Sequence, residues 1–156
     1  MISYLMNSRT EAEAEFARRI LPLARRWRAE ADRAVADLGL SDATGWLLLQ
    51  VGRLGDGARQ TELAAALDIQ GASLVRLVDQ VEAAGMVDRR VDAQDRRANR
   101  IFLTDAGRAL VGQIETSLRA IRHDLFQDVK DGDLATANAV LALLDQRMLG
   151  RREGAR

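Results

Sequence analysis

Residues 86–91 and 99–103 are two short β-prone segments in a chain whose other patterned segments are helical. Both segments are apolar at their outer ends, and the turn between them is strongly polar. Apolar, β-prone runs on either side of a polar turn predict a β-hairpin. The sequence therefore predicts a mainly α fold with one small β-hairpin, in the α+β class.

The turn of this hairpin contains the densest positive charge of the chain. Residues 89–100 contain five arginines against two aspartates, a net charge of +3. The formal net charge of the whole chain is zero. A basic field over the entire molecule is therefore excluded, and any contact with nucleic acid requires a local patch such as this one.

The segment before the hairpin predicts several helices. Residues 9–38 have an apolar stripe at helical spacing, and Pro22 is expected to kink or divide this helix because proline removes a backbone donor. Ser41 is expected to cap a short apolar helix, and residues 55–58 are expected to form a turn. Thr61 is expected to cap the helix that follows.

A tight connection at residues 68–71 leads into another short helix, which is expected to stop at Gly85. Four apolar residues of this helix have the spacing i, i+3, i+4, i+7 and predict a buried face: Leu74, Leu77, Val78 and Val81. Two short helices joined by a tight turn form a helix-turn-helix, and the appended hairpin makes it winged. Such a helix fits the major groove of DNA, and an arginine at a hairpin tip fits the minor groove.

The C-terminal part is also predicted to be helical. Thr104 is expected to cap a long helix, residues 131–133 to break it, and a last amphipathic helix to run over about residues 134–149. The long helix has an apolar stripe formed by Leu110, Ile114, Leu118, Ile121 and Leu125. The flanking helices have more apolar surface than one small lobe can cover, which predicts a homodimer.

Several classes of protein are excluded by what the sequence lacks. The chain has no cysteine, which excludes a disulfide scaffold, a zinc finger and a thiol redox sensor, and its single histidine, His123, argues against a histidine-rich metal site. We find no nucleophile–base pair, metal-ligand cluster or phosphate-cradling glycine loop, so we expect no enzyme and no cofactor. No run of apolar residues suggests a signal peptide or a membrane span, and the expected compartment is the cytoplasm.

The segment "LVRLVDQVEAAGMVDRRVDAQDRRANRIFLTDAG" resembles the recognition helix and wing of the MarR family of bacterial transcription regulators, in its SlyA-like branch. The similar parts are the "SLVRLVDQ" helix, the Gly-x-Val strand start, the Asp-Arg-Arg-Ala wing, the closing Leu-Thr-x-x-Gly and, upstream, "GLSDATGW". The resemblance extends to the long helices on either side. Ala93 departs from it, since many relatives carry proline there, and the lack of cysteine excludes the peroxide-sensing branch.

The resemblance implies roles for individual residues. It places five residues where the recognition helix meets DNA: Gln70, Ala72, Ser73, Arg76 and Gln80. In the wing it places Arg97 in the minor groove and Arg96 and Arg100 toward the DNA backbone, with Asp95 steadying the wing through arginine pairing. The plainer alternative for Arg76 is a solvated position on an amphipathic helix, and Arg89 and Arg90 are equally well explained as charges at the end of a strand.

The resemblance also implies a space for a small ligand between the dimerisation helices and the DNA-binding lobe. Arg25, Trp27, Arg28 and Trp46 lie on the helices that line this space in relatives, and an aromatic wall with an arginine suits an aromatic acid. The alternative, favoured for both tryptophans, is packing in the core.

Together these observations predict one MarR-type unit over residues 1–156. Residues 41–104 form its winged helix-turn-helix lobe, and residues 9–38 and 108–149 form its dimerisation helices. The predicted function is that of a homodimeric transcription regulator on a pseudo-palindromic double-stranded operator, a repressor relieved by a small ligand. The alternative is a winged-helix protein-interaction module without specific DNA binding.

Overall fold

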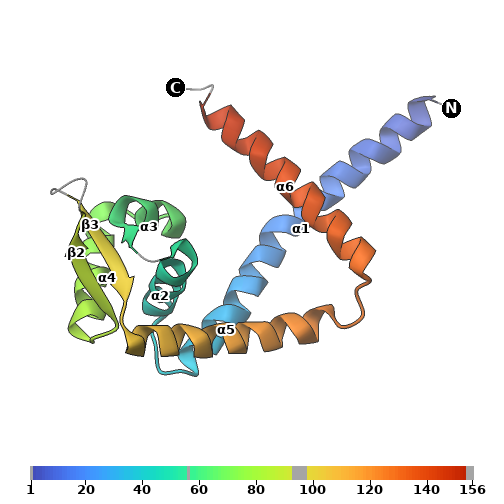
Figure 1. Ribbon diagram of the computed structural model, residues 1–156. Coiled ribbons are helices and arrows are strands. Elements are labelled where there is room, and N and C mark those ends of the chain that lie inside the picture. The colour runs from blue at the N-terminus through green and yellow to red at the C-terminus, as the bar shows by residue number, and fades with distance from the viewer. Residues whose placement is uncertain (1, 56, 93–97, 154–156) are drawn as a thin grey trace. The chain divides into compact units, whose positions relative to one another are not determined.

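The computed structural model describes residues 2–55, 57–92 and 98–153. The chain forms two compact units, Met1–Ile121 and Arg122–Arg156, and each is described by itself. The elements, labelled in Figure 1, are α1 (Ile2–Ala36), α2 (Asp42–Leu54), β1 (Ala58–Arg59), α3 (Gln60–Leu67), α4 (Gly71–Ala83), β2 (Val87–Val91), β3 (Asn99–Leu103), α5 (Asp105–Phe126) and α6 (Asp131–Glu153). This mainly α chain with a small sheet has the predicted winged helix-turn-helix fold.

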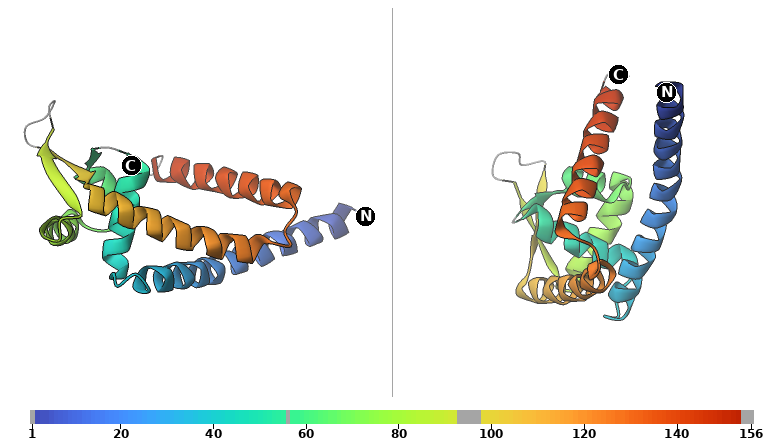
Figure 2. Two further views of the ribbon diagram at one scale, coloured as in Figure 1. Left: turned by 60° about the horizontal axis from the view of Figure 1, so that its bottom comes forward. Right: turned by 90° about the vertical axis from the view of Figure 1, so that its right-hand side faces the viewer.

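The sheet contains three antiparallel strands in the order β1-β3-β2, rather than the predicted hairpin alone. Val87 is opposite Leu103 and Val91 opposite Asn99 in the β2–β3 pair, while β1 contributes only Ala58 and Arg59. The prediction of a turn over residues 55–58 was therefore wrong at Ala58, because a two-residue strand leaves no periodicity in the sequence. Figure 2 shows this sheet from two further directions.

Most helix ends are where local chemistry predicts them. The Ser41 hydroxyl accepts from the Thr44 backbone N at 3.2 Å, and the Thr104 hydroxyl accepts from the Gly107 backbone N at 3.0 Å. These bonds confirm both predicted caps. Thr61 is not a cap, because α3 already begins at Gln60.

Two predicted helix breaks were also wrong. The helix α1 continues through Pro22, so the predicted division was wrong, while the predicted kink stays a prediction. Proline removes only one backbone donor, and the turns on either side keep theirs. The acidic stretch at residues 131–133 begins α6 instead of breaking a helix, because aspartates are favourable near the positive end of a helix dipole. The actual break lies between Phe126 and Asp131.

One apolar core holds the winged lobe together. Its buried residues come from α2, β1, α3, α4, β2 and β3: Leu47, Leu48, Val51, Ala58, Leu63, Leu74, Val78, Val81, Val87 and Ile101. The predicted buried face of α4 is thus confirmed for Leu74, Val78 and Val81, while Leu77 is only partly buried. This face fixes which side of α4 is turned outward.

A second core joins α1, α2 and α5. It consists of Ala31, Ala34, Val35, Leu49, Ile114 and Leu118. Ile114 and Leu118 are therefore covered by their own chain, which corrects the expectation that the whole α5 stripe faces a partner. Trp27 is 38% exposed, so packing in the core, the favoured alternative for it, was wrong within this chain, whereas Trp46 is partly buried against this second core.

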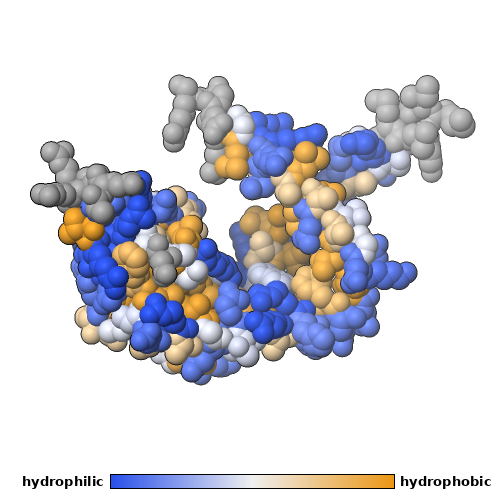
Figure 3. All heavy atoms as spheres, in the orientation of Figure 1, coloured by the Kyte–Doolittle hydropathy of each residue, from blue (hydrophilic) through white to orange (hydrophobic). Residues whose placement is uncertain are grey.

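The large apolar side chains of α6 lie at the surface. Five are exposed, namely Val140, Leu141, Leu143, Met148 and Leu149, and Figure 3 shows hydrophobic residues reaching the surface along this helix. Residues 139–144 are apolar at every position, so the helix is apolar around its whole circumference there and not amphipathic as predicted. Among the described residues, no helix is both long and apolar enough to cross a membrane.

Candidate nucleic-acid interface

The helices α3 and α4 form the helix-turn-helix. Asp68 adopts the left-handed conformation with φ of 52°, which aspartate tolerates better than most residues, and the Ile69 backbone N donates to the Ala64 carbonyl at 3.1 Å. Gln70 then stands at the N-cap of α4. The turn is therefore short and closed by backbone bonds, and it sets the start of the second helix.

The structure brings together the five residues predicted to meet DNA on this helix. All five are exposed: Gln70, Ala72, Ser73, Arg76 and Gln80. Because Leu74, Val78 and Val81 are turned into the core, Arg76 projects from the opposite side, as its spacing predicts. Arg76 has no ion pair within residues 2–55, 57–92 and 98–153.

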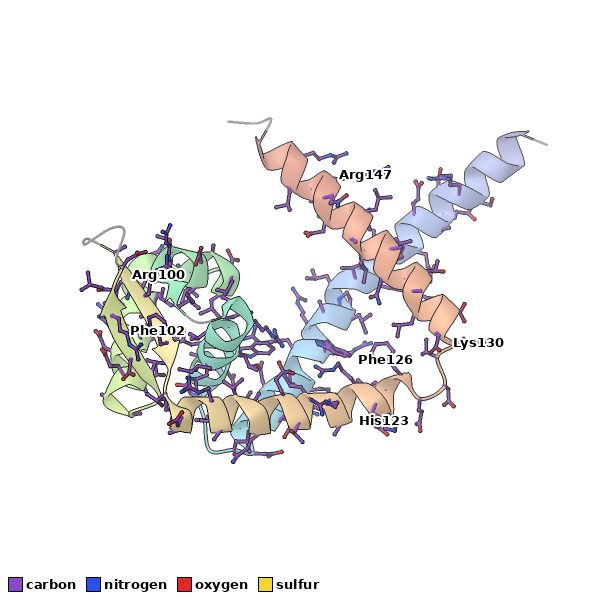
Figure 4. The ribbon with its side chains drawn as sticks, viewed as in Figure 1. Arg100, Phe102, His123, Phe126, Lys130 and Arg147 are labelled. Carbon is purple, nitrogen blue, oxygen red and sulfur yellow. The ribbon has the colours of Figure 1, made fainter. Side chains whose placement is uncertain are left out.

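The wing begins with an ionic cluster around Asp92, whose role the sequence analysis left unassigned. Asp92 is 2% exposed, and its Oδ2 accepts from Arg100 Nε at 2.8 Å and lies 3.4 Å from Arg59 Nη2. Arg100, shown on β3 in Figure 4, also donates from Nη1 to the Gly57 carbonyl at 3.1 Å. One buried carboxylate thereby joins all three strands, and the only signal in the sequence was an acid among arginines at a strand end.

Gly57 makes this arrangement possible. Its φ is +87°, in a region that side chains rarely adopt. A Cβ at this position would lie 2.9 Å from the Phe102 ring and 3.2 Å from Arg100 Cδ. The backbone of β1 can therefore approach β3 closely only because residue 57 is glycine.

Arg89 and Arg90 are not equivalent, although they are adjacent on β2. Arg89 is largely buried and links β2 to α4, since its backbone N donates to Glu82 Oε1 at 3.1 Å and its Nη2 donates to Asp79 Oδ1 at 2.5 Å. Arg90 is exposed, lies 3.3 Å from Asp88 Oδ2 and stacks 4.5 Å from the centre of the Phe102 ring. The strand-end explanation therefore fits Arg90, while Arg89 holds β2 against α4.

The remaining predicted residues lie between β2 and β3 in the sequence. Arg96, Arg97, Asp95 and the departing Ala93 lie outside the described residues. Their roles stay predictions based on the sequence. Within the described part of the wing, Arg89, Arg90 and Arg100 are each paired with carboxylates, so the net positive charge seen in the sequence is partly neutralised there.

Two of the four predicted ligand-binding residues lie together. The Trp46 indole Nε1 donates to Asp32 Oδ1 at 2.6 Å, the Arg28 Nε donates to the same oxygen at 2.8 Å, and the Arg28 guanidinium lies 4.2 Å from the centre of the Trp46 ring. Asp32, which the sequence analysis did not select, is the centre of this cluster. Arg25 and Trp27 lie on exposed positions of α1 within a turn of Arg28.

An open cavity of about 480 Å³ lies elsewhere in the lobe, where β2 and β3 meet the start of α5. It is lined by Asp88, Arg90, Phe102, Leu103, Thr104, Asp105 and Arg108, and none of the four predicted ligand-binding residues is among them. Its two arginines are matched by two aspartates, so the cavity has no excess charge. Within the described part of the chain, no group of three or more His, Cys, Asp or Glu residues could hold a metal ion.

Comparison with known proteins agrees with this geometry. The sequence model of the MarR family matches residues 38–98. The transcriptional regulator PA3341 is 34% identical over 86% of this chain and 98% of that chain, with a TM-score of 0.79. The MarR family transcription regulator SP03579 is 22% identical over 96% and 98% of the two chains, with a TM-score of 0.82. CouR from Rhodococcus jostii RHA1, bound to p-coumaroyl-CoA, is 24% identical over 77% and 84%, with a TM-score of 0.67. With its helix-turn-helix, its wing and these relatives, the chain belongs to the MarR family of winged-helix transcription regulators.

Proposed function

We propose that this regulator binds double-stranded DNA in a sequence-specific manner with α4 in the major groove. The observation that carries the proposal is the division of α4 into two sides. Leu74, Val78 and Val81 anchor one side in the core, and Ser73 and Arg76 are exposed on the rest of the surface. A helix anchored in this way can present its polar side chains to base edges without losing its packing.

The proposed contacts extend from α4 to the wing. In the major groove we assign Gln70, Ala72, Ser73, Arg76 and Gln80. In the wing we assign Arg97 to the minor groove and Arg96 to the phosphates, with Asp95 pairing with arginine to steady the tip. For Arg100 we propose a phosphate contact through the third of its side chain that is exposed, since Asp92 and Gly57 already occupy two of its nitrogens.

The regulator is proposed to act as a homodimer on a pseudo-palindromic operator. Support comes from exposed apolar residues on α1, among them Phe16, Leu21 and Leu23, and separately from those on α6. Apolar surface of this extent suits a second copy of the chain. Two recognition helices would then contact half-sites roughly 34–36 Å apart.

A small ligand is proposed to relieve repression. CouR, a protein of the same fold, was solved with p-coumaroyl-CoA, and the cluster of Arg28, Asp32 and Trp46 combines an arginine with an aromatic wall. A ligand carboxylate would compete with Asp32 for Arg28, and Arg25 and Trp27 would contact the rest of the ligand. Such a ligand changes DNA affinity only through its different affinities for the two arrangements of the dimer.

The test is a binding titration on duplexes selected from a random pool by the protein, read by fluorescence anisotropy at several salt concentrations. We expect affinity to fall steeply with salt, because phosphate contacts release counterions. Arg76→Ala should reduce the preference for the selected duplex over random DNA by about 1–3 kcal/mol. Lys130→Ala, a control in the segment between α5 and α6, should leave that preference unchanged.

Two results would contradict the proposal. Failure to select any duplex, or binding that ignores salt, would favour the protein-interaction module instead. An equal loss on selected and random DNA for Arg76→Ala would reduce that residue to a phosphate contact.

A further inference from the structure

The exposed surface of α4 has two flanks of different chemistry. With about 100° between successive residues, Gly71, Ala72 and Val75 fall in one sector, and Ser73, Arg76 and Gln80 fall in the adjacent one. The second sector offers hydrogen-bonding side chains, whereas the three residues of the first have no side-chain donor or acceptor. We call the first sector the apolar flank.

Val75 is the largest side chain of the apolar flank. It is 40% exposed, in the second turn of a helix whose other exposed residues are small, polar or charged. The same side of the helix continues toward its C-terminus with Asp79 and Glu82, and both of these are held by Arg89 from β2. The acidic groups of this side are thus tied to the protein, and its N-terminal half remains apolar.

In the major groove the apolar group that a base edge presents is the 5-methyl of thymine. Guanine, adenine and cytosine present donors and acceptors there, which suit Arg76, Gln80 or Ser73 better than a valine. Resting on the proposed function, we propose that Val75 is a specificity-determining residue that contacts a thymine 5-methyl group in each half-site. The two flanks would then read different bases, the polar flank by hydrogen bonds and the apolar flank by contact with methyl groups.

The experiment replaces each thymine of the selected duplex by deoxyuridine, one position at a time in both half-sites. Uracil keeps the hydrogen-bonding groups of thymine and lacks its methyl, so only the apolar contact is lost. For the wild-type protein we expect one or two positions at which affinity falls roughly fourfold for each methyl removed. This fold-change corresponds to the free energy of burying one such group.

Val75→Ala should weaken binding to the thymine duplex and abolish the further loss with uracil, so the two changes form a double-mutant cycle with a clear coupling. Leu54→Ala is the matched control, because Leu54 is an exposed apolar residue of the same lobe, 46% exposed, outside α4. It should keep the full sensitivity to uracil. Thermal melting of both variants should match the wild type, since neither residue is in a core.

The outcomes separate this inference from the proposed function. Tight, salt-dependent binding to the selected duplex without any uracil-sensitive position would overturn the role of Val75 and leave DNA binding intact. Uracil sensitivity that persists in full in Val75→Ala would also overturn it, and would assign the methyl contact to another residue. Failure to bind any duplex would overturn both proposals.

Discussion

The winged lobe and the helix α6 differ in where their large apolar side chains lie. In the lobe, Leu47, Leu48 and Leu63 are completely buried. In α6, Leu141 and Leu149 are 49% and 53% exposed, and none of its described residues is buried. Both regions are rich in leucine, so composition does not separate them. The difference is whether the same chain supplies a surface that covers the leucines.

This contrast says which part of the molecule can be stable by itself. The apolar run at residues 139–144 is longer than one helical turn, and a helix that is apolar all round is normally buried. The lobe already has a closed core of its own. We therefore expect the stability of the lobe to be independent of protein concentration and that of α6 to depend on a partner surface.

The largest effect should separate two leucines. Leu48→Ala removes a fully buried side chain from the lobe core and should lower the free energy of unfolding by about 2–5 kcal/mol. Leu141→Ala removes an exposed one, and its cost should appear as weaker self-association. Urea denaturation at two protein concentrations, together with sedimentation, measures both quantities.

The comparison fails if the two leucines behave alike. If Leu141→Ala lowered the free energy of unfolding as much as Leu48→Ala at every protein concentration, with unchanged sedimentation, α6 would be covered by its own chain. A loss for Leu48→Ala that disappears at high concentration would mean that the lobe also depends on a partner.

The next effect concerns two glycines of the same helix, α5. A Cβ at Gly107 would lie 2.0 Å from the Met86 carbonyl oxygen, whereas one at Gly112 meets no other described atom within 4 Å. Gly107→Ala should therefore destabilise the lobe by about 1–3 kcal/mol, because the obstacle is backbone and cannot rotate away. Gly112→Ala should stabilise by roughly 0.5–1 kcal/mol through the lower entropy of its unfolded chain.

Thermal melting of the two variants measures whether the contact with the Met86 carbonyl, rather than the helix propensity of alanine, decides the stability at position 107. If Gly107→Ala melted at or above the wild-type temperature, the lobe would not need the close approach of α5 to the Met86 carbonyl for its stability. The variant Gly112→Ala is the control for any general effect of alanine in α5.

Much of this fold is predictable because its determinants are local. The caps at Ser41 and Thr104 depend on a hydroxyl and a backbone group three residues away, and the buried face of α4 depends only on spacing. The strand β1 was not predicted, because two residues are too few to show the alternation of a strand. The buried positions of Ile114 and Leu118 were not predicted either, since periodicity identifies a stripe without saying which surface covers it.

The candidate site is less predictable, because its supporting residues act across elements. The positions on α4 follow from one helical repeat, and the resemblance supplies their role. Asp92 and Asp32 gain their importance only when the fold brings them to Arg100 and to Trp46. The neighbouring sequence does not distinguish Asp32 from a solvated aspartate, and the only signal for Asp92 is its place among arginines at the end of a strand.

A smaller effect should distinguish the two described aspartates of the wing. Asp92→Asn removes a buried charge from two arginines and should cost about 1–2 kcal/mol of stability, because Arg59 and Arg100 are 43% and 33% exposed and water compensates part of the loss. Asp88→Asn breaks only an exposed pair with Arg90 and should cost less. Urea denaturation gives both values, and equal costs would contradict the role of Asp92 as the link between the three strands.

The smallest effect tests whether an ion pair at the surface contributes to stability as burial in the core does. Arg53 on α2 and Glu115 on α5 form an ion pair at 3.2 Å, with 45% and 32% of their side chains exposed. Exposed pairs contribute little because water and salt screen them, so Arg53→Met should change the free energy of unfolding by no more than about 1 kcal/mol. The change should shrink further in high salt. Urea denaturation at low and high salt measures this, and a salt-independent loss as large as that of Leu48→Ala would mean that the lobe is held by charge as much as by burial.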